Sequence, residues 1–205
     1  MPTPNSPSRL PLFLDLSACR VLLVGGGRTA EAKLAPLRQA GASIRSVALR
    51  HHDAFLRAAD QLGGVELITG PYQTRHLDGI RLVVSATDDP GTNAQVAREA
   101  RERNLFCNAV DDPEACDAYF ASSFKRGPWQ LAIGTGGAFP GLSRTLRQVL
   151  DQLIPPDHGA TLEELGRLRQ RLRTVLPEPD RRRRTLERLL AAFRRTYFPI
   201  KEHLK

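Results

Sequence analysis

The stretch VLLVGGGRTAEAKL, residues 21–34, constrains the fold of this chain more than any other. A short apolar run leads into three glycines, and an alanine-rich run follows, which predicts a buried strand, a tight turn and a helix. Gly25, Gly27 and Ala30 match the G-x-G-x-x-A variant of the dinucleotide-binding pattern. In that pattern the first glycine makes the turn, the second admits the pyrophosphate, and the small third residue lets helix and strand pack closely.

The alternative interpretation of the glycines is a purely structural turn. Cofactor binding is favoured because the motif follows a strand, precedes a helix and stands near the start of a βαβ series. The helix start, at Arg28 and Thr29, would direct free N–H groups at phosphates. The acid that usually binds the ribose about twenty residues later is missing, since Leu49 and Arg50 stand there and the first acid is Asp53. Arg50 could meet a 2′-phosphate, or backbone contacts alone could hold the adenosine. The residues therefore predict a nicotinamide dinucleotide and leave NAD and NADP open.

The rest of the first part of the chain alternates between strand-like and helix-like segments. Strands are predicted at 20–25, 43–49, 65–70, 80–87 and 105–110, and helices at 29–40, 53–62 and 93–104. Short connections between such segments are typical of a parallel sheet with helices on both faces. The predicted fold class is therefore α/β and Rossmann-like.

The pattern changes after Pro113. Residues 118–137 contain two strand-like pieces around the turn KRGP, and a helix over 140–154 ends at Pro155 and Pro156. From Thr161 onward the chain is predicted to be helical, with TLEE as a capping box and a break at LPEPD. The sequence thus predicts an all-helical C-terminal part.

Charge is concentrated in that C-terminal part. The chain carries a net charge of +8, and residues 156–205 alone hold 13 basic against 7 acidic residues. Such a segment could attract nucleic acid, a membrane surface or a polycarboxylate substrate, or it could be a solvated helix face. No apolar run is long enough to cross a bilayer and no signal peptide is evident, so we expect a cytoplasmic protein.

Cysteine and histidine spacing argue against a metal site or a disulfide framework. Cys19, Cys107 and Cys116 are odd in number and show no C-x-x-C spacing, so reduced thiols are expected. The five histidines show no metal-ligand spacing either. No bound metal is predicted.

Polar side chains follow the fourth and fifth strands, where a doubly wound sheet binds its ligand. Thr87 is expected to contact the cofactor. Each aspartate in these loops could instead be a helix cap or a turn residue. For Asp111 this alternative and a functional role are equally supported, and for Asp112 the alternative is favoured. The candidate reactive groups at the two strand ends are Thr87, Asp88, Asp89, Asn108, Asp111 and Asp112.

Several motifs occur together in this chain: PLFLDL, the glycine stretch, VVSATDDPGTN, FCNAVDDP, SSFKRGPWQLAIGTGGAFPGLSRTLRQ and a basic helical tail. Together they make the chain resemble precorrin-2 dehydrogenase. This is the N-terminal half of siroheme synthase, which also occurs free-standing. The resemblance runs from about Leu10 to the end, and without the methyltransferase module the stand-alone form is expected. The Pro and Ser content of the N-terminus predicts a disordered lead-in at 1–9. The resemblance implies a homodimer with an NAD-binding Rossmann domain at 10–114, a dimerisation segment at 115–154 and a basic helical domain at 155–205.

The implied reaction is the oxidation of precorrin-2 to sirohydrochlorin with NAD⁺ as hydride acceptor. The essential aspartate of the family's C-N-x-V-D motif corresponds to Asp111, where a carboxylate makes sense as general base. The resemblance also assigns cofactor contacts to Arg28, Thr29, Leu49 and Arg50.

The polycarboxylate substrate fits a basic cleft edge, although ordinary surface cations are the alternative for each residue. The loop GTGGAFP departs from the family's S-T-G-G-x-S-P, with Phe139 in place of a serine, and Ala121 replaces a proline. Substrate contacts are predicted at Asn108, Lys125, Arg126, Thr135, Gly136, Gly137 and Arg144.

Two other functions stay open from the sequence. The enzyme could also insert Fe²⁺ into its product, since chelation in the family is thought to reuse the same aspartate. A non-catalytic NAD-sensing module could bind a polyanion through the arginine run at 181–184. The motifs CNAVDDP and GTGG favour the enzyme, so the expected partners are a tetrapyrrole and a second copy, with neither nucleic acid nor membrane.

Overall fold

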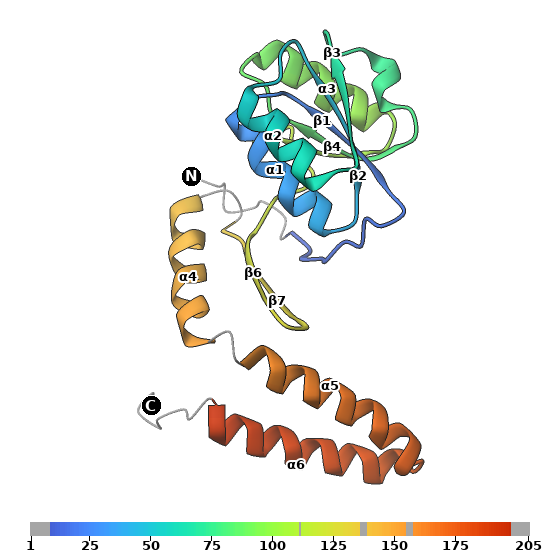
Figure 1. Ribbon diagram of the computed structural model, residues 1–205, viewed down its shortest axis with the longest axis vertical. Helices are drawn as coiled ribbons and strands as arrows, with labels where there is room; N and C mark the ends of the chain where they lie inside the picture. The colour runs from blue at the N-terminus through green and yellow to red at the C-terminus, as the bar shows by residue number, and fades with distance from the viewer. Residues whose placement is uncertain (1–8, 111, 136–138, 155–157, 198–205) are drawn as a thin grey trace. The chain divides into compact units, whose positions relative to one another are not determined.

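The computed structural model describes residues 9–110, 112–135, 139–154 and 158–197. The chain divides into two compact units (Figure 1). The first comprises residues 1–120 and 134–139, and the second comprises 121–133 and 140–205. The predicted boundaries of the NAD-binding domain, the dimerisation segment and the helical domain stay predictions.

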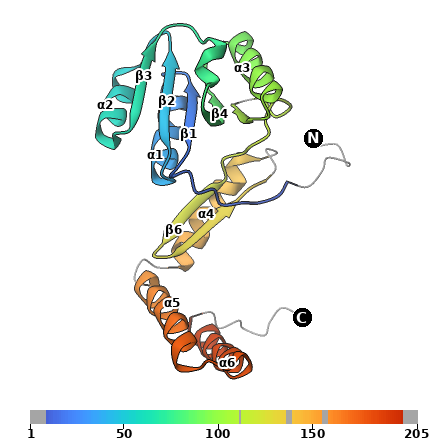
Figure 2. The same cartoon turned by 90° about the vertical axis from the view of Figure 1, so that its right-hand side faces the viewer.

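The first unit is a parallel five-stranded sheet in the order β3-β2-β1-β4-β5. Figure 2 shows α1 and α2 on one face of this sheet and α3 on the other. The Rossmann-like fold predicted from the sequence is confirmed. The elements are β1 (Arg20–Val24), α1 (Arg28–Gln39), β2 (Ser43–Ala48), α2 (Asp53–Leu62), β3 (Val65–Thr69), the 3₁₀ helix η1 (Thr74–Leu77), β4 (Ile80–Ser85), α3 (Pro90–Glu102) and β5 (Phe106–Ala109).

The central strand β1 explains why the sheet has two apolar faces. Val21 and Leu23 belong to the core cluster under α1 and α2, whereas Leu22 and Val24 belong to the cluster under α3. All four are buried, as expected when side chains alternate on a sheet that is covered on both sides. A continuous apolar run, rather than an alternating one, is therefore the sequence mark of this strand.

The second unit begins with an antiparallel hairpin of β6 (Ser122–Arg126) and β7 (Trp129–Ile133). Three helices follow, α4 (Pro140–Leu153), α5 (His158–Val175) and α6 (Pro179–Tyr197). The Trp129 ring lies 6.2 Å from the Phe193 ring of α6, and a Cβ at Gly127 would lie 2.7 Å from the Gly159 carbonyl oxygen at the start of α5. The predicted helical C-terminal part is confirmed.

Two helix starts differ from the predictions. The capping box at Thr161 is wrong, because α5 already begins at His158 and Thr161 lies inside it. Helix α3 begins at Pro90 rather than Asn93, because the Asp89 carboxylate accepts the N–H groups of Gly91 and Thr92 and proline fits the first helical turn.

Two buried histidines make the stability of the first unit depend on pH. His51 Nε2 lies 3.0 Å from the Ser46 hydroxyl, and His76 Nδ1 accepts the Gln73 N–H at 3.0 Å. Burial lowers the pKa of both histidines, and the charges of Arg75 and Arg45 lower that of His76 further. The fold therefore requires the neutral rings.

We expect the free energy of unfolding to fall as the pH drops below about 6.5, where unfolded histidine takes up a proton. The folded pKa is the lower one, so the unfolded chain binds more protons in this range, and the contribution is complete above it. Urea unfolding at several pH values measures the slope. His76→Asn, whose amide oxygen can still accept the Gln73 N–H, should flatten it, and an unchanged slope would contradict the assignment to His76.

Candidate functional site

The glycine turn lies at the carboxyl ends of β1, β2 and β4 and is held by backbone contacts on both sides. The Gly25 N–H donates to the Val47 carbonyl at 2.8 Å, and the His52 N–H donates to the Gly26 carbonyl at 2.9 Å. Gly25 has a φ of 126°, and a Cβ there would lie 2.3 Å from the Ala86 carbonyl oxygen. A side chain at this position is excluded by conformation and by space.

Gly26 is equally constrained, which the dinucleotide pattern does not indicate. A Cβ on Gly26 would lie 2.4 Å from the Arg50 carbonyl oxygen and 2.8 Å from the His51 Cα. Both atoms belong to the backbone of the β2–α2 connection, so neither can swing aside. Gly26 thus fixes how closely the turn approaches the end of β2.

Gly27 is open by comparison, as its predicted role requires. The nearest atom to a Cβ there would be His52 Cε1, at 3.8 Å. Gly27 caps α1 without a side-chain hydrogen bond, so the first N–H groups of the helix are left for a ligand. Arg28 and Thr29 are exposed in the first turn, and Ala30 is fully buried against the sheet. This arrangement suits a pyrophosphate.

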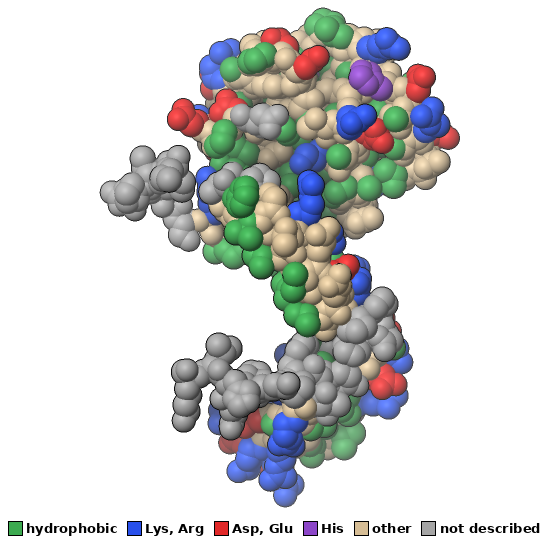
Figure 3. All heavy atoms as spheres, turned by 90° about the vertical axis from the view of Figure 1, so that its left-hand side faces the viewer, with side chains coloured by type: hydrophobic (Ala, Val, Ile, Leu, Met, Phe, Trp, Pro, Cys, Tyr) green, Lys and Arg blue, Asp and Glu red, His purple; other side chains and the backbone are tan. Residues whose placement is uncertain are grey.

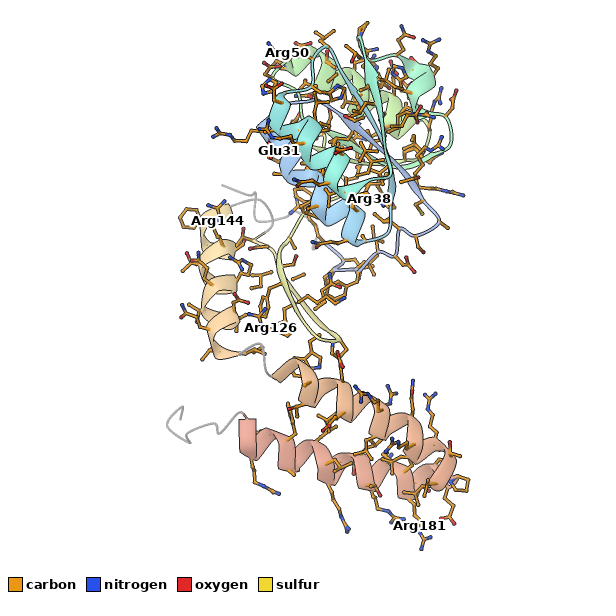
Figure 4. The ribbon with its side chains drawn as sticks, viewed as in Figure 1. Glu31, Arg38, Arg50, Arg126, Arg144 and Arg181 are labelled. Atoms are coloured by element: carbon orange, nitrogen blue, oxygen red, sulfur yellow. The ribbon has the colours of Figure 1, made fainter. Side chains whose placement is uncertain are left out.

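The connection from β2 to α2 presents a cation where many dinucleotide-binding folds present an acid. Leu49 and Arg50 are both exposed, whereas His51 turns inward to Ser46. Arg50 has no hydrogen bond or ion pair with any described residue, and Figure 4 shows its side chain at the surface of the first unit. The first carboxylate after β2 is that of Asp53, at the start of α2.

Thr87 is held by Asn93, a residue that the sequence did not single out for the site. The Thr87 N–H and hydroxyl both donate to Asn93 Oδ1, at 3.2 and 2.8 Å, and Asn93 Nδ2 donates to the Thr87 carbonyl at 3.0 Å. The Ser85 hydroxyl donates to the same Oδ1 at 2.7 Å. A buried asparagine one turn into a helix could have indicated such an anchor.

Two of the aspartates before α3 and after β5 have the structural roles that the sequence offered as the alternative to a function. Asp89 is the cap of α3, and hydrogen bonds from Thr92 and Gly91 lower its pKa. Asp112 Oδ1 accepts the N–H groups of Glu114 and Ala115, which makes it a turn residue. Asp111 lies outside the described residues, so its role stays a prediction.

Asn108 ties β5 to the loop that follows. It is 7% exposed, and its Nδ2 donates to the Ala118 carbonyl at 2.8 Å and to Cys116 Sγ at 3.3 Å. The three cysteines are free, as predicted, and burial raises the pKa of Cys107 to about 12. Substrate contact by Asn108 stays a prediction, since the observed contacts of its amide are structural.

The basic residues predicted to bind substrate differ in their surroundings. Arg126 is half-buried, with Nη2 at 2.5 Å from Asp151 Oδ1 and Nε at 3.1 Å from the Ile154 carbonyl oxygen, so it holds the end of α4 to the hairpin. Lys125 and Arg144 are exposed. Thr135 Oγ1 accepts the Phe139 N–H at 3.3 Å. Gly136 and Gly137 lie outside the described residues.

A basic cavity of about 550 Å³ lies along α5. The sequence predicted the charge of this helix but not the cavity. Among its lining residues are Pro128 of the hairpin turn and the arginines 167, 169 and 173. Arg167 pairs with Glu163 at 3.2 Å, so the cavity is only partly neutralised.

Two kinds of site are missing from the described part of the chain. There, no three histidine, cysteine, aspartate or glutamate side chains come together as a metal site would require. None of the described helices combines the length and the apolar composition of a membrane span.

Comparison with known proteins places the chain among dinucleotide-binding proteins. A family model described as "Putative NAD(P)-binding" matches residues 12–122. The chain is 41% identical over 174 residues to siroheme synthase of Pseudomonas entomophila (strain L48), covering 85% of this chain and 37% of the relative. It is 39% identical over 181 residues to siroheme synthase of Methylococcus capsulatus (strain Bath), covering 88% and 38%. The chain thus spans less than two fifths of these relatives' length.

A solved structure shares the fold. SirC, a precorrin-2 dehydrogenase, superposes with a TM-score of 0.74 at 22% identity, covering 88% of this chain and 89% of that chain. The family match contains all five parallel strands, the glycine turn and the loops after β4 and β5. Because this match extends over more than half of its residues, the chain belongs to that NAD(P)-binding family.

Proposed function

We propose that this chain oxidises precorrin-2 to sirohydrochlorin with a nicotinamide dinucleotide as acceptor. The observation that carries the proposal is the open start of α1 behind Gly27, at the carboxyl edge of a parallel sheet. The relatives' name, siroheme synthase, and that of the structural neighbour, precorrin-2 dehydrogenase, support this substrate class.

The residues of the first unit fit a dinucleotide. The free N–H groups at the start of α1 would bind the pyrophosphate, with Arg28 and Thr29 beside it. Leu49 and Arg50 would meet the adenosine end, and the Asn93-anchored loop would place Thr87. When bound, the oxidised nicotinamide supplies the hydride acceptor.

The chemistry also needs a proton acceptor and a counter-charge for the substrate. Precorrin-2 loses a hydride to the dinucleotide and a proton to the enzyme, and we assign the proton to the Asp111 carboxylate. Lys125 and Arg144, both exposed, would attract the substrate's carboxylates. The products are sirohydrochlorin, the reduced dinucleotide and one proton.

The test is an anaerobic incubation of the full chain with precorrin-2 and NAD⁺ or NADP⁺, read as absorbance of the reduced nicotinamide. We expect the reduced dinucleotide and sirohydrochlorin in equal amounts. Dinucleotide binding without turnover would overturn the enzyme and support a sensing module. A parallel incubation with Fe²⁺, read as siroheme, tests iron insertion separately.

We further propose that the enzyme is a homodimer in which α4 forms the contact. Four large apolar side chains of α4 are 43% to 63% exposed and recur at helical spacing, so they make one stripe. Figure 3 shows hydrophobic side chains gathered in a row on this part of the chain. The four side chains are those of Leu142, Leu146, Val149 and Leu153. A contiguous apolar row of this kind marks a protein interface.

Leu146→Glu should therefore convert the dimer to a monomer, because it places a charge in the middle of the stripe. Light scattering after size-exclusion chromatography measures the mass. Gln148→Glu adds the same charge to an exposed position of α4 outside the stripe and should leave the dimer intact. A wild-type chain that is monomeric, or a dimeric Leu146→Glu, would contradict the proposal.

A further inference from the structure

One face of α5 continues from the hairpin turn into the basic cavity. The residues of this face recur every three or four positions along the helix. They are Gly159, Glu163, Gly166, Gln170 and Arg173. Gly159 lies against the turn at Gly127, and the other four line the cavity together with Pro128 of the same turn. Figures 1 and 2 both show the tip of the β6–β7 hairpin beside the start of α5. The hairpin turn and α5 thus form the cavity together.

The hairpin side of the cavity is held in place by the end of α4. Arg126 Nε donates to the Ile154 carbonyl at 3.1 Å, and the same guanidinium forms an ion pair with Asp151. Gly127 has a φ of 51°, and a Cβ there would lie 2.7 Å from a carbonyl oxygen of α5. The position of Pro128, the next residue, is therefore set by packing. A ligand would find this wall already formed, with little of it left to order.

The lining carries more positive than negative charge. Arg167 is paired with Glu163 at 3.2 Å, which leaves Arg169 and Arg173. Both are exposed, and neither forms an ion pair with any described residue. They are four residues apart, so they lie about 6 Å from each other along the helix axis. Two guanidinium groups at this spacing suit a molecule with two neighbouring carboxylates or phosphates, since each group can form paired hydrogen bonds.

Gly166 leaves the middle of the lining open. A Cβ on Gly166 would meet no atom within 4 Å. Glycine inside a helix is less favourable than alanine, so the residue does not serve the stability of α5 itself. The volume of about 550 Å³ lies in the range of sites for small organic ligands. A solvated helix face would explain the arginines, but it would not explain a cavity of this size above a glycine.

We propose that this face of α5 binds a small molecule that carries two or more carboxylate or phosphate groups. Arg169 and Arg173 would bind two of these groups, and Pro128 and Gly166 would contact the remainder of the molecule. All of the lining residues belong to the second unit, whereas the glycine turn belongs to the first. The proposal therefore uses no residue that we assign to the dinucleotide, and it does not depend on the proposed oxidation.

The probes are tripolyphosphate and citrate, titrated calorimetrically into the full chain at constant ionic strength, with sodium chloride as the reference. Binding of either anion supports the site, and the tighter one identifies the preferred acidic group. Trp129 is the only tryptophan of the chain and follows Pro128 in the hairpin, so its fluorescence should change on binding. The melting temperature should rise with anion concentration, because the ligand binds only the folded chain.

Two double variants separate the cavity from general surface charge. Arg169→Gln with Arg173→Gln should weaken binding at least about tenfold, because each substitution removes a charge-assisted contact. Arg184→Gln with Arg188→Gln is the matched control. It removes two exposed arginines of α6 that are also four residues apart and form no ion pair with any described residue, so binding should stay at the wild-type level.

Gly166→Leu tests the cavity itself, because it keeps every arginine and fills the space between them. It should abolish binding without destabilising the helix, since leucine is a better helix former than glycine. Thermal melts check that all variants fold. Absence of binding to both anions in the wild-type chain would overturn the proposal. Equal losses in the two double variants, or undiminished binding by Gly166→Leu, would reduce the effect to surface charge and overturn the proposal as well.

Discussion

Gly26→Ala should lower the free energy of unfolding by about 3 kcal/mol, at the upper end of the cost of overpacking. The added methyl group would stand 2.4 Å from the Arg50 carbonyl oxygen and 2.8 Å from the His51 Cα, so the β2–α2 connection would have to move away from the turn. Urea unfolding measures the loss. The variant should also lose dinucleotide affinity, because the shifted connection carries Arg50.

Gly27→Ala is the matched control for this prediction. The nearest atom to its methyl group would be His52 Cε1 at 3.8 Å, an ordinary van der Waals contact, so stability should change by less than about 0.5 kcal/mol. Dinucleotide affinity should still fall, since the methyl group occupies the approach of the pyrophosphate. Similar stability losses in the two variants would show that the turn is not packed as described.

Asp111→Asn should reduce the turnover of precorrin-2 by about 10²- to 10⁴-fold, the usual contribution of a general base. The amide cannot take the proton that leaves the substrate. Dinucleotide affinity and the melting temperature should stay near their wild-type values. Steady-state rates of nicotinamide reduction, with binding measured separately, distinguish loss of chemistry from loss of binding.

The neighbouring aspartate offers the control. Asp112→Asn keeps an oxygen that can accept the Glu114 and Ala115 N–H groups, so the turn and the rate should survive. Turnover within tenfold of wild type in Asp111→Asn would remove that residue from the chemistry. Equal losses in both variants would point to the shape of the loop instead of to one carboxylate.

The parallel sheet was predictable because its information is local. Apolar runs such as VLLV are buried on both faces, and glycines or aspartates mark where strands end and helices begin. The start of α5 was not predictable in this way. The local signal, a capping box at Thr161, lies inside the helix, which begins at His158. The next residue, Gly159, lies against Gly127 of the hairpin. This contact joins residues far apart in sequence, which a local pattern does not reveal.

The sequence predicted where the candidate site lies, but it did not predict several of the contacts that hold it together. The pattern marks Gly25 and Gly27, but the need for Gly26 arises from the β2–α2 connection, which no local pattern reveals. The sequence predicted Arg126 as a surface cation, whereas the fold places it in an ion pair with Asp151. Side chains whose partners lie on other elements are those for which sequence reasoning fails.

The four hydrogen bonds that converge on the Asn93 amide bear on how fast a ligand is captured. A loop that is already fixed has little conformational entropy left to lose, so its ordering adds no slow step to association. Nucleotide capture at this edge should then follow a single exponential whose rate rises linearly with ligand concentration. Thr87 would thus belong to a rigid template, set when the chain folds and ready before any ligand arrives.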